Sequence, residues 1–208
     1  MTEAEQDAAI TAVLPHVPRF GWTMAAARAG GAEALFPRGA ADLLDGFAAW
    51  ADRRMAEAAE RADMAALRTA ARVRAVILLR LALLRPHREA VRRAVGHPMR
   101  CQARARSLDA IWHAAGERLE GPSRHSKRLL LGAVYAATLL VWLREAEAGE
   151  AATADFLDRR LADVRRIGDI RTRVGNFFLR RPSLYPAHAR IRKSFGEMMR
   201  KLSVTSSQ

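Results

Sequence analysis

A run of 15 uncharged residues, Leu129 to Leu143, constrains the fold of this chain more than any other feature. It lies between the basic residues Arg128 and Arg144. A membrane-spanning helix needs about 20 apolar residues, so the run is too short for a span. It is also too apolar around its circumference for an ordinary surface helix. Such a helix must pack against several apolar neighbours. These can be the protein core, a partner subunit or a bound lipid.

The composition predicts an all-α protein. Ala, Leu, Arg and Glu dominate the 208 residues, and alternating runs of β-branched residues are absent. The single cysteine, Cys101, excludes an internal disulfide and a cysteine-cluster metal site. The N-terminal residues have no basic flank followed by an apolar core, so we expect no secretory signal and a cytoplasmic protein.

The net charge of +13 is distributed unevenly. Residues 1–66 hold 6 Arg and 10 Asp or Glu, whereas the remainder holds 29 basic and 12 acidic residues. Two segments, 85–106 and 171–208, concentrate the basic excess. The acidic N-terminal third argues against binding to nucleic acid phosphates.

Helical periodicity and breakers predict about nine or ten helices. The first starts at Ala4 and has an end blurred by Pro15 and Pro18. The other main predicted segments are 40–61, 63–84 with Asp63 as its cap, 87–95, 99–117, 124–146, 153–174 and 187–202.

Five separated segments have distinctive sequences. They are VPRFGWT at 17–23, ALFPRGAADLL at 34–44, LDAIWHAAGE at 108–117, SKRLLLGAVYAATLLVWL at 126–143 and TADFLDRRLADV at 153–164. In this order and spacing they resemble the Coq-nine family of ubiquinone-biosynthesis accessory proteins, which has a TetR-like fold. The resemblance covers roughly residues 17–165. It implies a degenerate helix-turn-helix head at 1–62, a lipid-binding and dimerisation body at 63–175, and a basic amphipathic tail at 176–208.

The family resemblance implies a lipid-binding accessory protein that is not an enzyme and needs no cofactor other than its bound lipid. The ligand would be an isoprenoid, a quinone precursor or a phospholipid, presented by a homodimer at the inner membrane. A demethoxyubiquinone hydroxylase is the implied partner. The aromatic-rich docking run of the family is replaced here by residues 117–125, which argues against the same docking surface.

The alternative is a TetR-type transcriptional regulator with a hydrophobic ligand pocket. Reading DNA sequence needs a helix that presents polar side chains to base edges. The candidate segment, GAEALF at 31–36, offers only Glu33, so DNA binding is disfavoured.

Apolar faces on three predicted helices are candidates for the lipid-binding wall. These residues are Val73, Val76, Ile77, Leu81, Ile111, Trp112, Leu131, Val134, Tyr135 and Thr138. Periodicity alone leaves plain core packing as the other interpretation, because apolar residues at helical spacing usually form a core. Asp109 and Arg128 either form an internal polar tie or lie exposed.

The C-terminal segment has the pattern of a helix that lies on an anionic membrane. Its apolar face and cationic side provide the membrane-contact candidates Ile191, Phe195, Met198, Met199, Leu202, Arg192, Lys193 and Arg200. The alternative is a helix docked on the body with its basic side in solvent.

The sequence offers no catalytic or metal-binding constellation. Its six histidines have no i, i+4 pair and belong to no HExxH motif. We therefore expect neither a catalytic residue nor a metal ligand. The histidines are His16, His87, His97, His113, His125 and His188.

Overall fold

The computed structural model describes residues 2–97, 101–117, 124–144, 151–164 and 166. Every regular element in this part of the chain is helical, which confirms the predicted all-α class. The head comprises α1 (Glu3–Val13), η1 (Leu14–His16), α2 (Val17–Phe20), α3 (Met24–Ala29) and η2 (Glu33–Leu35). The body comprises α4 (Ala40–Arg61), α5 (Thr69–Leu84), η3 (Arg85–His87), α6 (Arg88–Val95), α7 (Cys101–Ala114), α8 (Arg124–Arg144) and helical residues 151–164.

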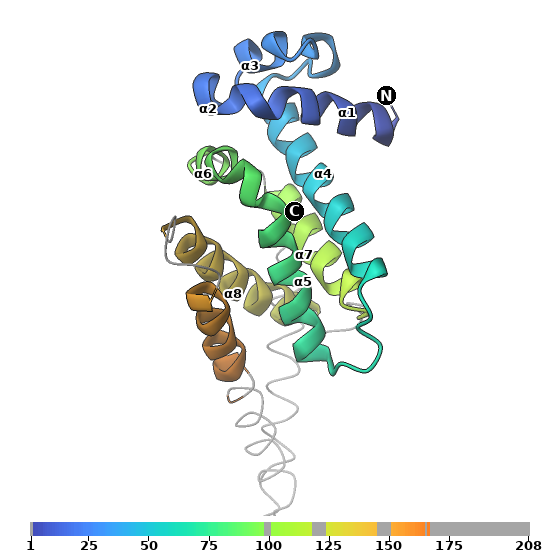
Figure 1. Ribbon diagram of the computed structural model, residues 1–208, viewed down its shortest axis with the longest axis vertical. Coiled ribbons are helices and arrows are strands. Elements are labelled where there is room, and N and C mark those ends of the chain that lie inside the picture. Colours follow the sequence, from blue (N-terminus) through green and yellow to red (C-terminus); the bar gives the residue numbers. More distant parts are fainter. Residues whose placement is uncertain (1, 98–100, 118–123, 145–150, 165, 167–208) are drawn as a thin grey trace, which may run out of the picture. The chain divides into compact units, whose positions relative to one another are not determined.

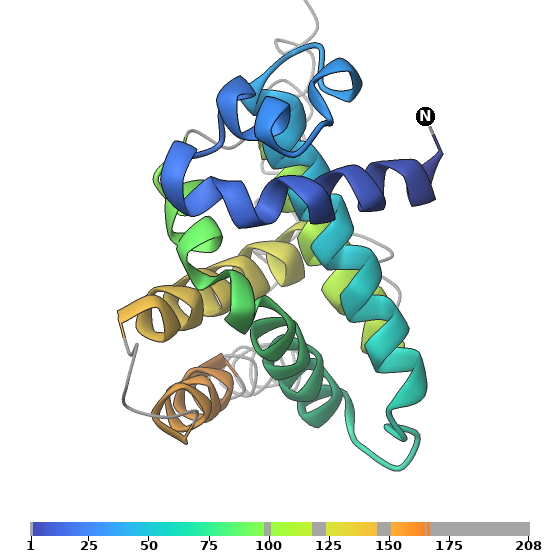
Figure 2. The same cartoon turned by 45° about the horizontal axis from the view of Figure 1, so that its top comes forward.

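The three small helices α1–α3 gather around one end of α4, as Figures 1 and 2 show. Gly30 permits their close crossing, because a Cβ on this residue would lie 2.8 Å from the Ala12 carbonyl oxygen. Two hydrogen bonds tie the head to α6. The Trp22 indole N–H donates to the Ala90 carbonyl at 2.9 Å, and Arg93 Nη2 donates to the Pro18 carbonyl at 2.9 Å.

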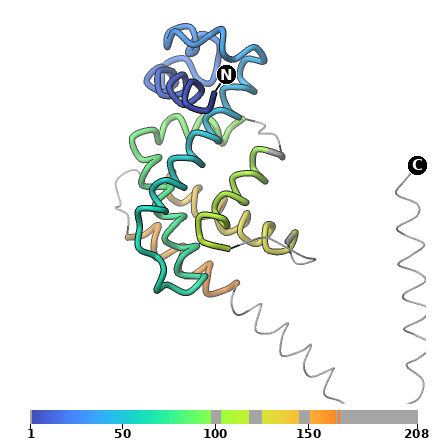
Figure 3. The backbone as a smooth tube through the Cα atoms, turned by 90° about the vertical axis from the view of Figure 1, so that its right-hand side faces the viewer, coloured from blue at the N-terminus to red at the C-terminus, as the bar shows by residue number. Residues whose placement is uncertain are grey.

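Helix α4 packs on α7 and α5, and its path from the head into the body can be followed in Figure 3. Five of its large apolar residues are buried, and its bounds agree with the predicted segment 40–61. These inward residues are Leu43, Leu44, Phe47, Trp50 and Met55. Because they contact the head at one end and the body at the other, one continuous core runs through both.

A buried ionic network joins four helices inside this core. Arg80 of α5 is only 5% exposed and pairs through Nη1 with Asp52 of α4. Its Nε donates to the Tyr135 hydroxyl of α8 at 2.9 Å. The Ser107 hydroxyl of α7 donates to the other Asp52 oxygen at 2.9 Å. Burial acts to lower the pKa of Arg80, but Tyr135 and Asp52 outweigh it, so that the pKa is raised and the guanidinium stays charged.

One predicted helix start was wrong, and the structure defines two segments that the sequence left open. Helix α5 begins at Thr69 rather than at Asp63, because residues 62–68 turn through a hydrogen bond from Leu67 N–H to the Met64 carbonyl. The first helix ends at Val13, where Pro15 introduces the turn η1. The candidate DNA-reading segment is the three-residue turn η2, too short to serve as a recognition helix.

Helix α8 as a whole is longer than the uncharged run inside it. By length and composition alone its stretch His125–Arg144 could cross a membrane. Within it, a segment of 18 residues has a mean hydropathy of 1.3, and 28% of that segment is buried. The core helix of a soluble protein passes the same test. Its residues Leu131, Thr138 and Trp142 are buried against the other helices of the body.

The chain divides into two compact units, Met1–Val164 and Arg165–Gln208. The elements above belong to the first unit. The second lies outside the described residues except for Arg166.

We predict that Asp52→Ala destabilises the protein by about 3–5 kcal/mol, because it leaves the buried Arg80 charge without its carboxylate. Urea unfolding measures the free energy. The matched control is Asp7→Ala, which breaks the more exposed Asp7–Arg53 pair and should cost about 1 kcal/mol or less. Equal losses for the two variants would contradict the assignment of Asp52 as the essential counter-ion.

Candidate functional site

A cavity of about 390 Å³ lies between α5, the end of α8 and the helix at 151–164. This volume falls in the range of small-molecule sites, about 300–1,000 Å³. Most of its wall is aliphatic. The described lining residues are Ala75, Leu78, Leu79, Leu81, Ala82, Arg85, Trp142, Ala151, Thr153 and Ala154.

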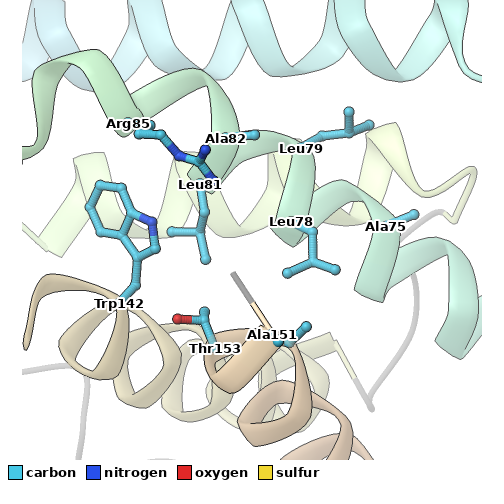
Figure 4. A pocket seen from close by; sticks show the side chains of 10 residues that line it. Ala75, Leu78, Leu79, Leu81, Ala82, Arg85, Trp142, Ala151 and Thr153 are labelled. Atoms are coloured by element: carbon cyan, nitrogen blue, oxygen red, sulfur yellow. The ribbon is translucent and has the colours of Figure 1, made fainter. Parts of the chain in front are cut away.

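The sequence of α5 explains why a cavity forms on one side of it. The helix is apolar on two faces, and the face with Val73, Val76 and Ile77 is buried in the core. The opposite face carries Leu78 and Ala82, which line the cavity. Figure 4 shows Leu78 and Leu81 pointing from α5 toward the facing helix. A helix that is apolar all round needs cover on every side, and here one side borders a hollow.

The two ends of the cavity differ in polarity. Trp142 and Arg85 lie at one end, and Ala75 lies at the other (Figure 4). The Arg88 guanidinium lies over the Trp142 ring at 4.4 Å from its centroid. Arg92 Nη2 donates to the Leu143 carbonyl at the C-terminal end of α8 at 3.0 Å. These contacts with α6 hold the Trp142 ring at the cavity wall.

The sequence-predicted lipid-binding residues lie mainly in the core. Eight are buried, and Trp112 and Tyr135 are partly buried against the same cluster. Leu81 is the one that also lines the cavity described above. The buried eight are Val73, Val76, Ile77, Leu81, Ile111, Leu131, Val134 and Thr138. A lipid-binding role for all ten residues, Leu81 included, stays a prediction.

Tyr135 and Thr138 have polar roles inside the bundle. The Tyr135 hydroxyl accepts from Arg80, and the Thr138 hydroxyl donates to the Val134 carbonyl at 2.8 Å within α8. The Trp112 indole N–H is buried and has no hydrogen-bond partner among the described residues. The polar interaction predicted between Asp109 of α7 and Arg128 of α8 is present, since Arg128 Nε donates to the Asp109 carboxylate at 2.8 Å.

The other predicted contact regions are described only in part. Glu117 accepts a hydrogen bond from the Thr69 hydroxyl at 2.7 Å, while residues 118–123 lie outside the described residues. The membrane-contact candidates between Ile191 and Leu202 also lie outside them. No group of three or more His, Cys, Asp or Glu that could hold a metal ion occurs in the described ranges.

Sequence reasoning missed Arg85 and Trp142 as residues of the cavity. Arg85 lies directly before Pro86 and Trp142 lies inside the uncharged run, so neither position marks a binding site in the sequence. The sequence signal that could have drawn attention to this region is the spacing of Arg85, Arg88 and Arg92, which places cations on one side of η3 and α6. Their contacts with α8, 50 or so residues later, cannot be read from that spacing.

The described residues define a class of protein: an all-helical bundle with an aliphatic cavity of small-molecule size. Residues 98–168 match the family model COQ9. The chain is also 26% identical over 193 residues to the mitochondrial ubiquinone biosynthesis protein COQ9-A of Xenopus laevis. That alignment covers 80% of this chain and 60% of the relative, so the chain spans about 60% of the length of the relative. The two findings confirm the family resemblance that the sequence motifs predict.

Proposed function

We propose that this protein is a lipid-binding accessory protein of ubiquinone biosynthesis rather than an enzyme. The observation that carries the proposal is the aliphatic cavity beside α5, which suits a hydrocarbon chain. The relative COQ9-A, whose name refers to ubiquinone biosynthesis, supports the pathway. Each methylene removed from water contributes about 0.8 kcal/mol, so a short buried chain is held firmly.

The rival function, DNA-dependent regulation, has little support in the described head. The segment that would read bases is a three-residue turn, and Glu33 is paired with Arg28 at 2.6 Å. The excess of acidic residues over residues 1–66 would repel phosphates. A gel shift at two salt concentrations tests the rival, since a regulator must show sequence preference and a salt slope.

We predict that filling the cavity prevents lipid binding without unfolding the protein. Ala154→Trp places an indole in the cavity, outside the core cluster. Native mass spectrometry should find lipid bound to the unaltered protein and about tenfold less on this variant. Ala66→Trp, at an exposed turn position, is the matched control and should retain the lipid. Equal lipid occupancy in all three proteins would place the ligand elsewhere, and no lipid on any of them would oppose the proposal.

The proposed site of action is the inner membrane, reached through the basic amphipathic segment 187–202. The sequence pattern supports this, since five apolar residues share one face beside several cations.

Phe195→Glu should therefore weaken flotation with anionic liposomes by about tenfold, because it places a carboxylate in the apolar face. Val204→Glu, beyond that face, is the control. Unchanged flotation of Phe195→Glu would oppose membrane contact by this segment.

A homodimer is the proposed assembly, formed through α8 and the helix at 151–164. One side of α8 exposes the α8 stripe, which consists of Leu129, Ala133, Ala136 and Leu140 at i, i+4, i+7 and i+11. Leu129 is 75% exposed and Leu140 49% exposed. Large exposed leucines on either side of small residues suit close packing against a second helix.

We predict that Ala136→Arg converts the dimer into a monomer, because a charge would be buried at the centre of the α8 stripe. Light scattering after size-exclusion chromatography measures the mass. Ala66→Arg adds the same charge away from α8 and should leave the dimer intact. A monomeric unaltered protein at all concentrations would oppose the dimer.

A further inference from the structure

A second pocket lies at the junction of the head with η3 and α6. It has a volume of about 240 Å³ and shares none of its described lining residues with the cavity beside α5. Helices α2 and α6 lie beside each other at this junction in Figures 1 and 2. Sites for drug-sized molecules usually measure about 300–1,000 Å³, so this pocket suits a molecule of one ring. Its apolar lining residues are Leu14, Pro15, Pro18, Pro86 and Ala90.

The wall of this pocket is held in place from both sides. Its three prolines fix their own backbone φ angles, which limits movement of η1, α2 and η3. The Ala90 carbonyl accepts from the Trp22 indole, and the Pro18 carbonyl accepts from Arg93, so the head is tied to α6 across the pocket. A pocket with such a wall favours a rigid ring over a flexible chain, because a ring loses less conformational freedom on binding.

The polar side of the pocket has hydrogen-bonding capacity that the described residues do not use. The His87 ring lies 5.5 Å from the Trp50 ring, centroid to centroid, and at 78° to it. No hydrogen bond or ion pair joins the His87 ring to another described residue. Burial lowers the pKa of His87, so its imidazole is neutral at pH 7 and offers one donor and one acceptor. The neighbouring Trp50 indole N–H is buried and also has no partner within the described ranges.

The charge on the wall is already compensated. Glu89 is the carboxylate among the described lining residues, and it pairs with Arg92 at 2.7 Å and with Arg93 at 3.1 Å. A charged ligand would leave water for a wall that offers it proline, leucine and alanine side chains. That transfer is costly without a counter-ion, so the lining favours an uncharged ligand.

We propose that this pocket binds a small uncharged molecule that consists of one six-membered ring with a hydroxyl group. The hydroxyl forms a hydrogen bond with the His87 imidazole, and the ring lies among the proline side chains. Phenols and alicyclic alcohols share this chemistry. The inference goes beyond the proposed lipid-binding function, which concerns the cavity beside α5.

Nuclear magnetic resonance on the full chain tests the ligand class. Trp50 contacts His87 and Trp142 lines the other cavity, so their indole N–H signals report on the two sites separately. The probes are phenol, cyclohexanol, toluene and benzoate. We expect the better of the two hydroxylated rings to shift the Trp50 signal and to bind about tenfold more tightly than toluene, as one hydrogen bond predicts. The tighter of phenol and cyclohexanol identifies the kind of ring.

Variants of His87 test the position of the hydroxyl. His87→Phe keeps a ring against Trp50 and should reduce the preference for the hydroxylated ligand over toluene from about tenfold to within about twofold. His87→Gln keeps a donor and an acceptor and should retain part of that preference. His113→Phe removes an exposed histidine of α7 and is the matched control. Thermal melting verifies the folding of each variant.

Four results would overturn the inference. They are equal affinity for toluene and the hydroxylated rings, tighter binding of benzoate than of phenol, a shift of the Trp142 signal in place of Trp50, and no shift with any probe. Each of these results leaves the proposed lipid-binding function in place, because none of the probes is a lipid.

Discussion

The body of this protein depends on the buried pairing of Arg80 with Asp52. A guanidinium in the middle of an apolar helix costs several kcal/mol unless a carboxylate meets it. Tyr135 accepts a further hydrogen bond from Arg80 and Ser107 donates one to Asp52, so four helices meet around one charge pair. This fixes the rotation of α5 about its axis. The face with Leu78 and Ala82 consequently points away from α4 and becomes a wall of the cavity.

The family match and the cavity overlap only in part. The matched residues 98–168 contribute Trp142 and the first turns of the helix at 151–164 to the wall. The rest of the wall comes from α5, which lies outside the matched segment. The matched segment 98–168 therefore supplies Trp142 and the wall from the helix at 151–164, while α5 supplies most of the aliphatic wall.

Sequence patterns predicted those parts of the fold that depend on local periodicity. Helix α4 follows from its apolar spacing, and its bounds agree with the prediction. The start of α5 does not, because a capping signal at Asp63 competes with a turn closed by Met64 and Leu67. The cavity itself was beyond sequence reasoning. Periodicity places residues on a helix face but does not say whether that face meets side chains or a hollow. Of the predicted wall residues, Leu81 lines this cavity, and its binding role stays a prediction.

The separation of two faces on α5 has a consequence for cargo exchange. One face belongs to the packed interior, and the other borders the hollow. In the proposed lipid-binding function, loading the hollow would leave the contacts of Val73, Val76 and Ile77 in place, whereas Leu81 and Trp142 belong both to the wall and to the core cluster. Ala82 lines the hollow and is not part of the core cluster, so a change there would alter the size of the proposed ligand while the core residues remain the same.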